Sequence, residues 1–257
     1  MCQLLGMNCN SPTDVCFSFA GFHRRGGATD THVDGWGIAF YEGPGVRLFI
    51  DTQPAAESPV AGLVKSYPIH SLNVIAHIRR ATVGGRALEN THPFQREMWG
   101  RYWTFAHNGT LKDFSPALNG RFRPVGATDS ERAFCLLLDT LHADFPDGTN
   151  DPDALKQSIA RAAEVFRAFG ECNFLLTNGD FLFAHCATNL GYILRSAPFS
   201  RAHLVDEDYE VDFNTVASPT DRIAVIATKP LTDNEPWTPM RPGELLVFRD
   251  GVPLGAA

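Results

Sequence analysis

Cys2 is the first candidate for chemistry, because a cysteine at the second position can become the first residue of the processed chain. Its side chain is small, so we expect removal of the initiator Met1, which would leave a free α-amino group on Cys2. A free α-amine has a pKa of about 7.7–8.0 and a free thiol one of about 8.5, so this residue would hold a nucleophile beside its own base. The alternative is that Cys2 is a small buried hydrophobic residue at the start of the first strand.

His107, Asn108 and Gly109 form a second candidate, directly after a strand expected over residues 102–106. An Asn side-chain amide and the next backbone N–H can together form a two-donor oxyanion hole. A glycine lets the backbone come close to a substrate. Asn-Gly is also the commonest dipeptide of hairpin turns, so a plain turn is the alternative.

Arg79 and Asp129 are the third candidates, because they carry opposite charges at the ends of expected elements. Arg79 ends a strand over residues 73–79, in which alternation places it on the same face as His77. An arginine there can hold a carboxylate through two parallel hydrogen bonds, or it can be a solvated edge charge. Asp129 opens a helix, where it can stabilise the helix dipole or receive a substrate ammonium group.

The order of these motifs resembles one family. Met-Cys at the start, His-x-Arg-x-Ala-Thr at 77–82, His-Asn-Gly at 107–109 and Thr-Asp-Ser-Glu at 128–131 are similar to the motifs of class II glutamine amidotransferases, which are N-terminal-nucleophile hydrolases. Segments 25–27, 32–37 and 90–94 look most like the small stand-alone, YafJ-like branch. The likeness is recognisable in motifs from Cys2 to about Phe134 and is weaker towards the C-terminus.

The resemblance implies a role for each matching position. Cys2 would be the nucleophile, and Asn108 and Gly109 would form the oxyanion hole. Arg79 would bind the α-carboxylate of glutamine, and Asp129 would bind its α-ammonium. The positions that would line the substrate pocket are Thr82, Trp36 and His107. We expect no metal and no organic cofactor, since the chain has no cluster of His or Cys with zinc spacing.

The chain departs from the synthase-linked members in three places. Arg80 and Val83 stand where those enzymes have a Trp and a His in the motif Arg-Trp-Ala-Thr-His-Gly. Gln3-Leu4 replaces the frequent Gly-Ile after the nucleophile. The domain that would consume ammonia does not follow within these 257 residues, so we expect a stand-alone protein.

Three functions fit these residues. The first is hydrolysis of a γ-glutamyl amide, in glutamine or a small γ-glutamyl compound, through a thioester on the N-terminal cysteine. The second is a glutaminase subunit that delivers ammonia to a separate synthase chain. The third is a catalytically silent sensor of a γ-glutamyl ligand. A retained Met1 would favour the third function, because Cys2 would then carry an amide nitrogen in place of a base.

Helices are expected where capping signals precede apolar periodicity. Ser11-Pro12 predicts the start of the first helix. Thr128 and Glu131 form a capping box before a second helix, whose apolar stripe continues to residue 141. Asp151-Pro152 predicts a third helix, which should end at Gly170.

Strands alternate with tight turns through the rest of the chain. Asn178-Gly179, between two apolar runs, predicts a hairpin. The expected strands cover residues 3–7, 36–41, 46–50, 73–79, 102–106, 173–177, 181–185, 223–228 and 245–249. The pattern predicts an α+β fold, a four-layer αββα sandwich of two antiparallel sheets, with Cys2 at the start of a central strand. With no repeat and no clear linker, we expect a single domain over residues 1–257.

The charge pattern limits the partners. With 22 Lys and Arg against 29 Asp and Glu, the formal net charge is −7, and basic residues occur only in short pairs such as 24–25 and 79–80. We therefore expect no nucleic-acid partner. No apolar run reaches membrane-spanning length, and no basic residue precedes Arg24 as a secretory signal would require. We expect a cytoplasmic protein with reduced cysteines, whose partner is a small γ-glutamyl molecule.

Overall fold

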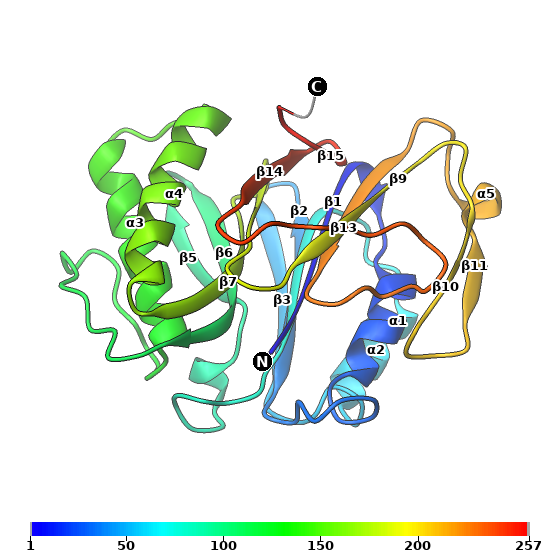
Figure 1. Cartoon of the computed structure of the whole chain (residues 1–257), viewed down its shortest axis with the longest axis horizontal. Coiled ribbons are helices and arrows are strands. Elements are labelled where there is room, and N and C mark those ends of the chain that lie inside the picture. Colours follow the sequence, from blue (N-terminus) through cyan, green and yellow to red (C-terminus); the bar gives the residue numbers. More distant parts are fainter. Residues whose placement is uncertain (1, 256–257) are drawn as a thin grey trace.

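A computed structural model describes residues 2–255 and consists mainly of strands with helices on the outside (Figure 1). The strands are β1 (Gln3–Thr13), β2 (Trp36–Glu42), β3 (Gly45–Asp51), β4 (Ser71–Ile78), β5 (Phe94–Met98), β6 (Arg101–Leu111), β7 (Gly170–Thr177), β8 (Leu182–His185), β9 (Gly191–Ser196), β10 (Arg201–His203), β11 (Glu210–Asp212), β12 (Arg222–Ala227), β13 (Thr238–Pro239), β14 (Leu245–Arg249) and β15 (Val252–Pro253). The helices are α1 (Cys16–Arg24), α2 (Pro59–Ser66), the 3₁₀ helix η1 (Leu88–Asn90), α3 (Asp129–Asp144), α4 (Pro152–Arg167) and α5 (Phe213–Val216).

Two large antiparallel sheets carry the architecture. One has seven strands in the order β13-β9-β12-β1-β4-β2-β3, and the other has six in the order β15-β14-β8-β7-β6-β5. Strand β1 is therefore the central strand of the larger sheet, and Cys2 lies directly before it. Both the antiparallel sheets and the place of Cys2 are as the sequence predicts.

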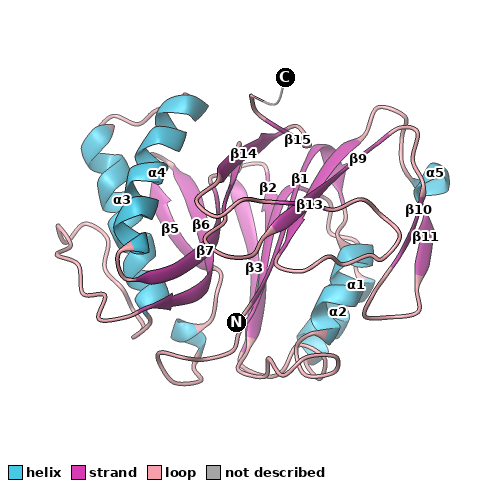
Figure 2. Ribbon diagram, viewed as in Figure 1, coloured by secondary structure: helices cyan, strands magenta, loops and turns pink. Residues whose placement is uncertain are grey.

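Helices cover the outer face of each sheet (Figure 2). Phe19 of α1 packs with Trp36 of β2 in the core on one side, and Phe134 of α3 packs with Phe105 of β6 on the other. A third apolar cluster, which includes Leu4, lies between the two sheets. The order helix, sheet, sheet, helix confirms the predicted four-layer αββα sandwich.

Two of the three predicted helix starts are correct. The Thr128 hydroxyl accepts a hydrogen bond from the Glu131 amide at the start of α3. The Asp151 carboxylate caps α4 by accepting from the amides of Asp153 and Ala154. Helix α4 ends at Arg167, however, and Gly170 already belongs to β7, so the predicted end is three residues late.

The predicted helix start at Ser11 is wrong. Ser11 extends β1, and α1 begins only at Cys16, where Asp14 accepts a hydrogen bond from the Cys16 amide. The Ser11 hydroxyl donates to the Asp221 carboxylate at 2.6 Å, so the residue expected to cap a helix bonds to a distant loop. This contact crosses 210 positions of the chain, which a local pattern cannot anticipate.

Several elements have only weak signals in the sequence. Helix α2 is not among the predicted helices, although it begins after the Ser58 cap with a proline at its first position. Six short strands are not among the predicted ones, because none of them is a long apolar run: β5, β9, β10, β11, β13 and β15. The hairpin at Asn178 is confirmed, since its side-chain oxygen accepts from the Asp180 and Phe181 amides between β7 and β8.

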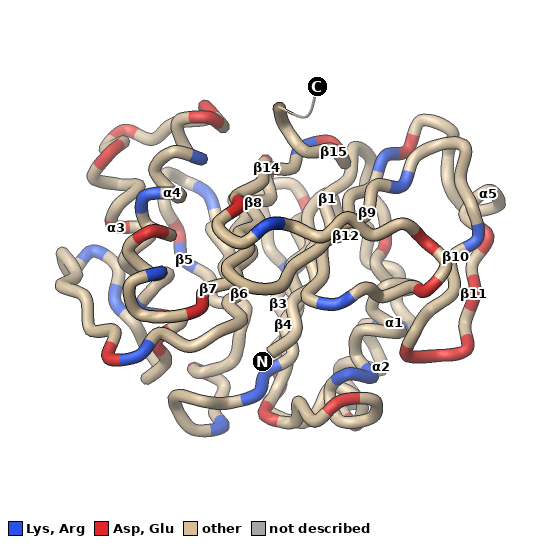
Figure 3. The backbone as a smooth tube through the Cα atoms, viewed as in Figure 1, with Lys and Arg blue, Asp and Glu red and all other residues tan. Residues whose placement is uncertain are grey.

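Charged residues of both signs are distributed along the chain (Figure 3). Lys and Arg positions are scattered among Asp and Glu positions, and the basic residues do not form one continuous stripe in this view. Within residues 2–255, no helix combines the length and apolar character needed to cross a membrane.

His77, His92 and His107 are among the buried histidines, and burial lowers the pKa of each. The His77 and His92 rings lie 4.2 Å apart between their centroids, and neither ring nitrogen of His92 has a hydrogen-bond partner among the described residues. The backbone of His107 lies near the His77 ring and partly opposes the lowering of its pKa. Burial lowers the pKa of His77 to about 3, with repulsion from His107 and Arg79 in the same direction. Burial also lowers the pKa of His92 and of His107, although Asp129 opposes the shift at His107.

These shifts predict that the fold loses stability in mild acid. The folded pKa values lie below the unfolded value of about 6.5, so the unfolded chain binds more protons as the pH falls. The free energy of unfolding should hold above pH 6.5 and fall below it by up to about 1.4 kcal/mol per pH unit for each histidine. The free energy of unfolding can be measured by denaturant titration at several pH values between 6 and 5. Its fall per pH unit should be smaller in His77→Gln than in the wild type by about that amount. An equal pH dependence of the unfolding free energy in the two proteins would contradict the burial of His77 in its neutral form.

Candidate active site

Strand alternation brings the candidate residues to one end of the layer between the sheets. Leu4 of β1 and Ala106 of β6 both face the apolar cluster between the sheets. Successive side chains of a strand point to opposite faces, so positions two residues away share that face. Cys2 is two residues before Leu4, and Asn108 is two residues after Ala106. Both therefore face the layer between the sheets.

The Cys2 thiol is held against the backbone just after β4. Its Sγ donates to the Arg80 carbonyl at 3.3 Å and accepts from the Arg80 amide at 3.2 Å. Burial raises the pKa of the Cys2 thiol; the backbone contact and Arg79 oppose this shift, and Asp129 adds to it. The thiol is therefore protonated at neutral pH and needs a base before it can act as a nucleophile.

Asn108 and Gly109 lie inside β6, paired with Asn173 and Cys172 of β7. A hairpin turn at this dipeptide, the alternative left open by the sequence, is therefore wrong. A Cβ at Gly109 would lie 1.8 Å from the Glu171 carbonyl oxygen, so the neighbouring strand excludes any larger residue. The glycine is required by close approach of β7, a reason that the sequence does not reveal.

Asn173 holds the backbone of Asn108 in place. Its side-chain nitrogen donates to the Asn108 carbonyl at 3.0 Å. Its oxygen accepts from three successive backbone amides, those of residues 187, 188 and 189. A side chain with that many fixed partners has one orientation, so the backbone on which Asn108 and Gly109 lie is rigid.

Arg79, which follows strand β4, and Asp129, the first residue of helix α3, both lie near Cys2. Each perturbs the pKa of the Cys2 thiol, and each attracts the other, since Asp129 raises the pKa of Arg79 against the lowering effect of burial. The Asp129 carboxylate accepts from the Leu111 amide at 2.7 Å. Neither charge forms an ion pair with another described residue. Two opposite charges thus lie near the thiol without neutralising protein partners.

The Arg79 guanidinium is covered by the loop after it. Its three hydrogen bonds go to the carbonyl oxygens of Val83, Gly84 and Gly85, at 3.0 to 3.1 Å. A guanidinium has five N–H donors, so two remain without a partner among the described residues. The same loop lines the surface above, through Thr82 and Val83.

Two adjoining pockets open at this end of the molecule. One, of about 550 Å³, is lined by Cys2, Thr82 and Gly109. The second, of about 680 Å³, is lined by Asp129. Thr110 and Lys112 line both pockets, so the thiol and the carboxylate face a continuous surface depression.

Two residues that the resemblance places in the pocket lining lie elsewhere. Trp36 is fully buried against Phe19, at 5.7 Å between ring centroids, under helix α1. His107 points to the helix side of its sheet, where Nε2 donates to the Glu171 carbonyl at 3.1 Å and Nδ1 accepts from the Ser130 hydroxyl at 2.8 Å. The structure therefore gives both a packing role, because alternation turns them away from the layer that contains Cys2.

Three residues that fix the backbone and side chains of the site are not among the candidates from the sequence: Asp34, Asn173 and Thr228. Asp34 accepts a hydrogen bond from the Ala81 amide at 2.8 Å, and its own amide donates to the Arg79 carbonyl. Thr228 contacts both β1 and Asn108. Asp34 lies in a segment that carried the resemblance, but Thr228 and Asn173 had no local signal, because their partners are distant in the chain.

The part of the chain that the structure describes contains no set of side chains that could hold a metal ion. No three side chains of His, Cys, Asp or Glu converge there. The chemistry available at the site is therefore that of a buried thiol, a cation, an anion and backbone or amide donors.

Comparison with known proteins identifies the family of this chain. The family model of class-II glutamine amidotransferases matches residues 1–257. The Escherichia coli (strain K12) protein named "Putative glutamine amidotransferase YafJ" is 53% identical over 248 residues, which are 96% of this chain and 97% of that protein. A Haemophilus influenzae protein with a similar name is 50% identical over 251 residues, 98% of this chain and 85% of its own.

Solved structures show the same fold. A crystal structure of a predicted glutamine amidotransferase from Pseudomonas aeruginosa PA01 has a TM-score of 0.79 and 45% identity, and the match covers 98% of this chain and 99% of that one. The glutamine phosphoribosylpyrophosphate amidotransferase of B. subtilis has a TM-score of 0.56 and 15% identity over 96% of this chain and 47% of its own, which shows the fold alone. With the family match over the full sequence, this chain belongs to the class-II glutamine amidotransferases.

Proposed function

We propose that this chain hydrolyses a γ-glutamyl amide, in glutamine or a small γ-glutamyl compound, with Cys2 as the nucleophile. The observation that carries the proposal is the set of groups around the Cys2 thiol. It borders an open pocket of about 550 Å³, and one unpaired cation and one unpaired anion both act on it electrostatically. A substrate with a zwitterionic α-carbon and a reactive γ-carbonyl is complementary to such an arrangement.

Arg79 and Asp129 would hold the α-groups of the substrate. The two N–H donors of Arg79 that have no protein partner are available for the α-carboxylate, and the loop at residues 83–85 keeps the guanidinium in place. Asp129 would accept from the α-ammonium group with the lone pairs that Leu111 leaves free. Thr82, at the pocket edge, would contact the substrate between them.

The reaction would run through a thioester. After removal of Met1, which lies outside the described residues, the α-amine of Cys2 takes the thiol proton and Sγ attacks the γ-carbonyl carbon. The C–N bond breaks, the proton passes to the leaving nitrogen, and ammonia or an amine departs. Water then attacks the thioester, which releases glutamate or its derivative and restores the thiol.

Asn108 and Gly109 would stabilise the tetrahedral intermediate of each step. The Asn108 side-chain amide and the Gly109 backbone N–H are the two donors, and β7 holds the backbone of both residues. Rigid donors aimed at a developing negative charge cost no reorganisation during the reaction, so they lower its barrier.

The nucleophile can be tested by comparing processed and unprocessed protein. Chain with a free Cys2 α-amine should release glutamate from a γ-glutamyl amide, and Cys2→Ala should not. Protein with Met1 or a leader still attached should be nearly inactive, because its Cys2 nitrogen is an amide and cannot act as a base. Intact mass and a product-release assay give the measurement. Cys9→Ala, a buried cysteine of the same strand, is the control that should stay active. Full activity with the leader attached would contradict the proposed base.

The oxyanion hole predicts a loss in turnover. Asn108→Ala should lower kcat about 10²–10³-fold and change KM much less, because the lost contact strengthens only in the transition state. Steady-state kinetics on folded protein measure both constants. Asn214→Ala, in the exposed helix α5, is the matched control and should match the wild type. An unchanged kcat in Asn108→Ala would remove Asn108 from the mechanism.

Loss of the proposed carboxylate-binding group, Arg79, should affect KM more than kcat. Arg79→Lys should raise KM about tenfold or more with a smaller effect on kcat, because an ammonium cannot replace the planar fork of donors. Arg86→Lys, an exposed arginine a few residues further along, should leave KM near the wild-type value. Equal KM values for the wild type and Arg79→Lys would argue against carboxylate binding at this position.

A further inference from the structure

We infer that Thr228 is a positioning residue, which orients the side-chain amide of Asn108 for catalysis. This inference rests on the proposed function, in which that amide stabilises the oxyanion. Thr228 follows the last residue of β12, and 120 positions separate it from Asn108. It belongs to neither pocket and contacts no charged group near the thiol, so its action would be through Asn108 alone.

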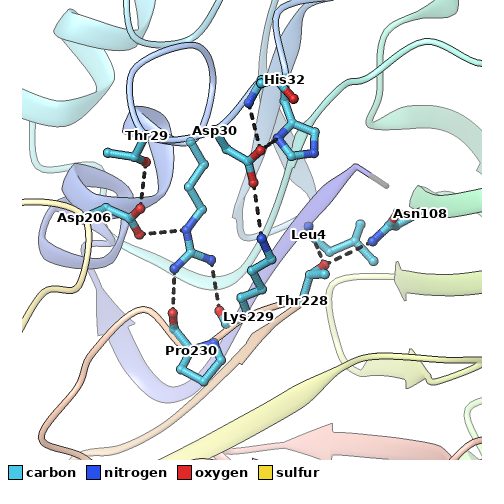
Figure 4. A network of polar contacts seen from close by, with 11 residues as sticks. Leu4, Thr29, Asp30, His32, Asn108, Asp206, Thr228, Lys229 and Pro230 are labelled. Carbon is cyan, nitrogen blue, oxygen red and sulfur yellow. Dashed lines mark hydrogen bonds and ion pairs between the residues drawn. The ribbon is translucent and has the colours of Figure 1, made fainter.

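The Thr228 hydroxyl is tied to the strand that begins after the nucleophile. Its Oγ1 accepts from the Leu4 amide at 2.9 Å, and the Thr228 amide donates back to the Leu4 carbonyl at 3.2 Å. Leu4 is two residues from Cys2 on β1. Figure 4 shows this hydroxyl between Leu4 and Asn108. The contact therefore joins the strand of the nucleophile to the amide in the opposite sheet.

Asn108 has no other side-chain hydrogen bond to a described residue. Its Nδ2 donates to Thr228 Oγ1 at 3.3 Å, and its buried Oδ1 has no partner in residues 2–255. A primary amide has two N–H donors, so the bond to Thr228 leaves one for the oxyanion. The hydroxyl oxygen has two acceptor positions, which Leu4 and Asn108 fill together.

The orientation of this amide decides whether it helps or hinders the reaction. Rotation by 180° would exchange its nitrogen for its oxygen and place a partial negative charge where a donor is needed. In the structure the nitrogen is on the Thr228 side, and rotation would break its bond to Thr228 Oγ1. Holding that orientation before the substrate binds is the preorganisation on which an oxyanion hole depends.

The segment after Thr228 is fixed by a buried arginine. Arg25 is 4% exposed and donates to the carbonyl oxygens of Lys229 at 3.0 Å and Pro230 at 2.5 Å. Its Nε also donates to the Asp206 carboxylate at 2.7 Å. Figure 4 labels three of its partners, Asp206, Lys229 and Pro230. The contacts hold both residues that follow Thr228, so its hydroxyl has little freedom to move away from Asn108.

The test compares a variant that lacks the Thr228 hydroxyl with a matched variant that keeps it. Thr228→Val has nearly the same shape and no acceptor, and it should lower kcat about tenfold, the rate equivalent of one neutral hydrogen bond, with little change in KM. Thr228→Ser keeps the hydroxyl and should restore most of the kcat. A merely structural role would instead lower the melting temperature or the active fraction and leave kcat per active site unchanged.

A double-mutant cycle shows whether Thr228 acts through Asn108. In the Asn108→Ala background, Thr228→Val should lower kcat no further, because the group that it positions is gone. A further tenfold loss in that background would overturn the proposal. A wild-type kcat for Thr228→Val alone would also overturn it.

The outcomes separate this inference from the proposed function. If the processed wild type has no amidase activity, or if Cys2→Ala keeps it, the proposed function fails and the inference fails with it. If activity depends on Cys2 and Asn108 but not on the Thr228 hydroxyl, the inference alone fails. If Thr228→Val does not fold, Thr228→Cys replaces it, because a thiol has similar size but accepts hydrogen bonds weakly. The same loss of kcat is then expected, and a wild-type value overturns the inference.

Discussion

The site depends on the register of two antiparallel sheets that stack face to face. Leu4, Ala106 and Ile226 fill the layer between the sheets, and the positions two residues further along the same faces are Cys2, Asn108 and Thr228. A shift of one residue in any of these strands would turn its functional side chain to the opposite face. Because burial of the apolar rows between the sheets fixes the register, the hydrophobic core also sets the geometry of the polar site at its end.

Buried polar side chains with backbone partners give this end of the molecule its rigidity. Asn173 bonds to four backbone groups, and Arg25 bonds to two carbonyl oxygens and a carboxylate. A buried polar group is costly when it lacks partners, so such satisfied networks permit one arrangement and penalise others. Among the candidate site residues, Asn108 and Gly109 lie on strand β6, whose backbone Asn173 holds, and a site on a supported strand is more precise than one on a loop.

The two charges beside the thiol, Arg79 and Asp129, have neutral hydrogen-bond partners. The partners of Arg79 are carbonyl oxygens, which hold the guanidinium without cancelling its charge, and the partner of Asp129 is a backbone amide. A protein carboxylate on Arg79 would have neutralised it and left nothing to attract a substrate. The loop with Gly84 and Gly85 supplies neutral acceptors that approach closely, so a positive and a negative charge remain unpaired near Cys2.

The sequence by itself determined the fold class and singled out the candidate residues of the site. Alternating apolar runs with tight turns predicted two antiparallel sheets, and the caps at Thr128 and Asp151 predicted two of the helix starts, because these signals act within a few residues. The order of the motifs singled out Cys2, Arg79 and Asp129, which the tertiary structure brings near one another.

Only the tertiary structure decided which neighbours these residues have. It turned Trp36 and His107 away from the pocket, placed Asn108 inside a strand and not in a turn, and kept Ser11 out of a helix. It also supplied Thr228, whose partner in the opposite sheet is 120 positions away. Such contacts form because distant strands pair and stack to bury their apolar faces, and no local pattern of residues records which polar side chains that packing brings together.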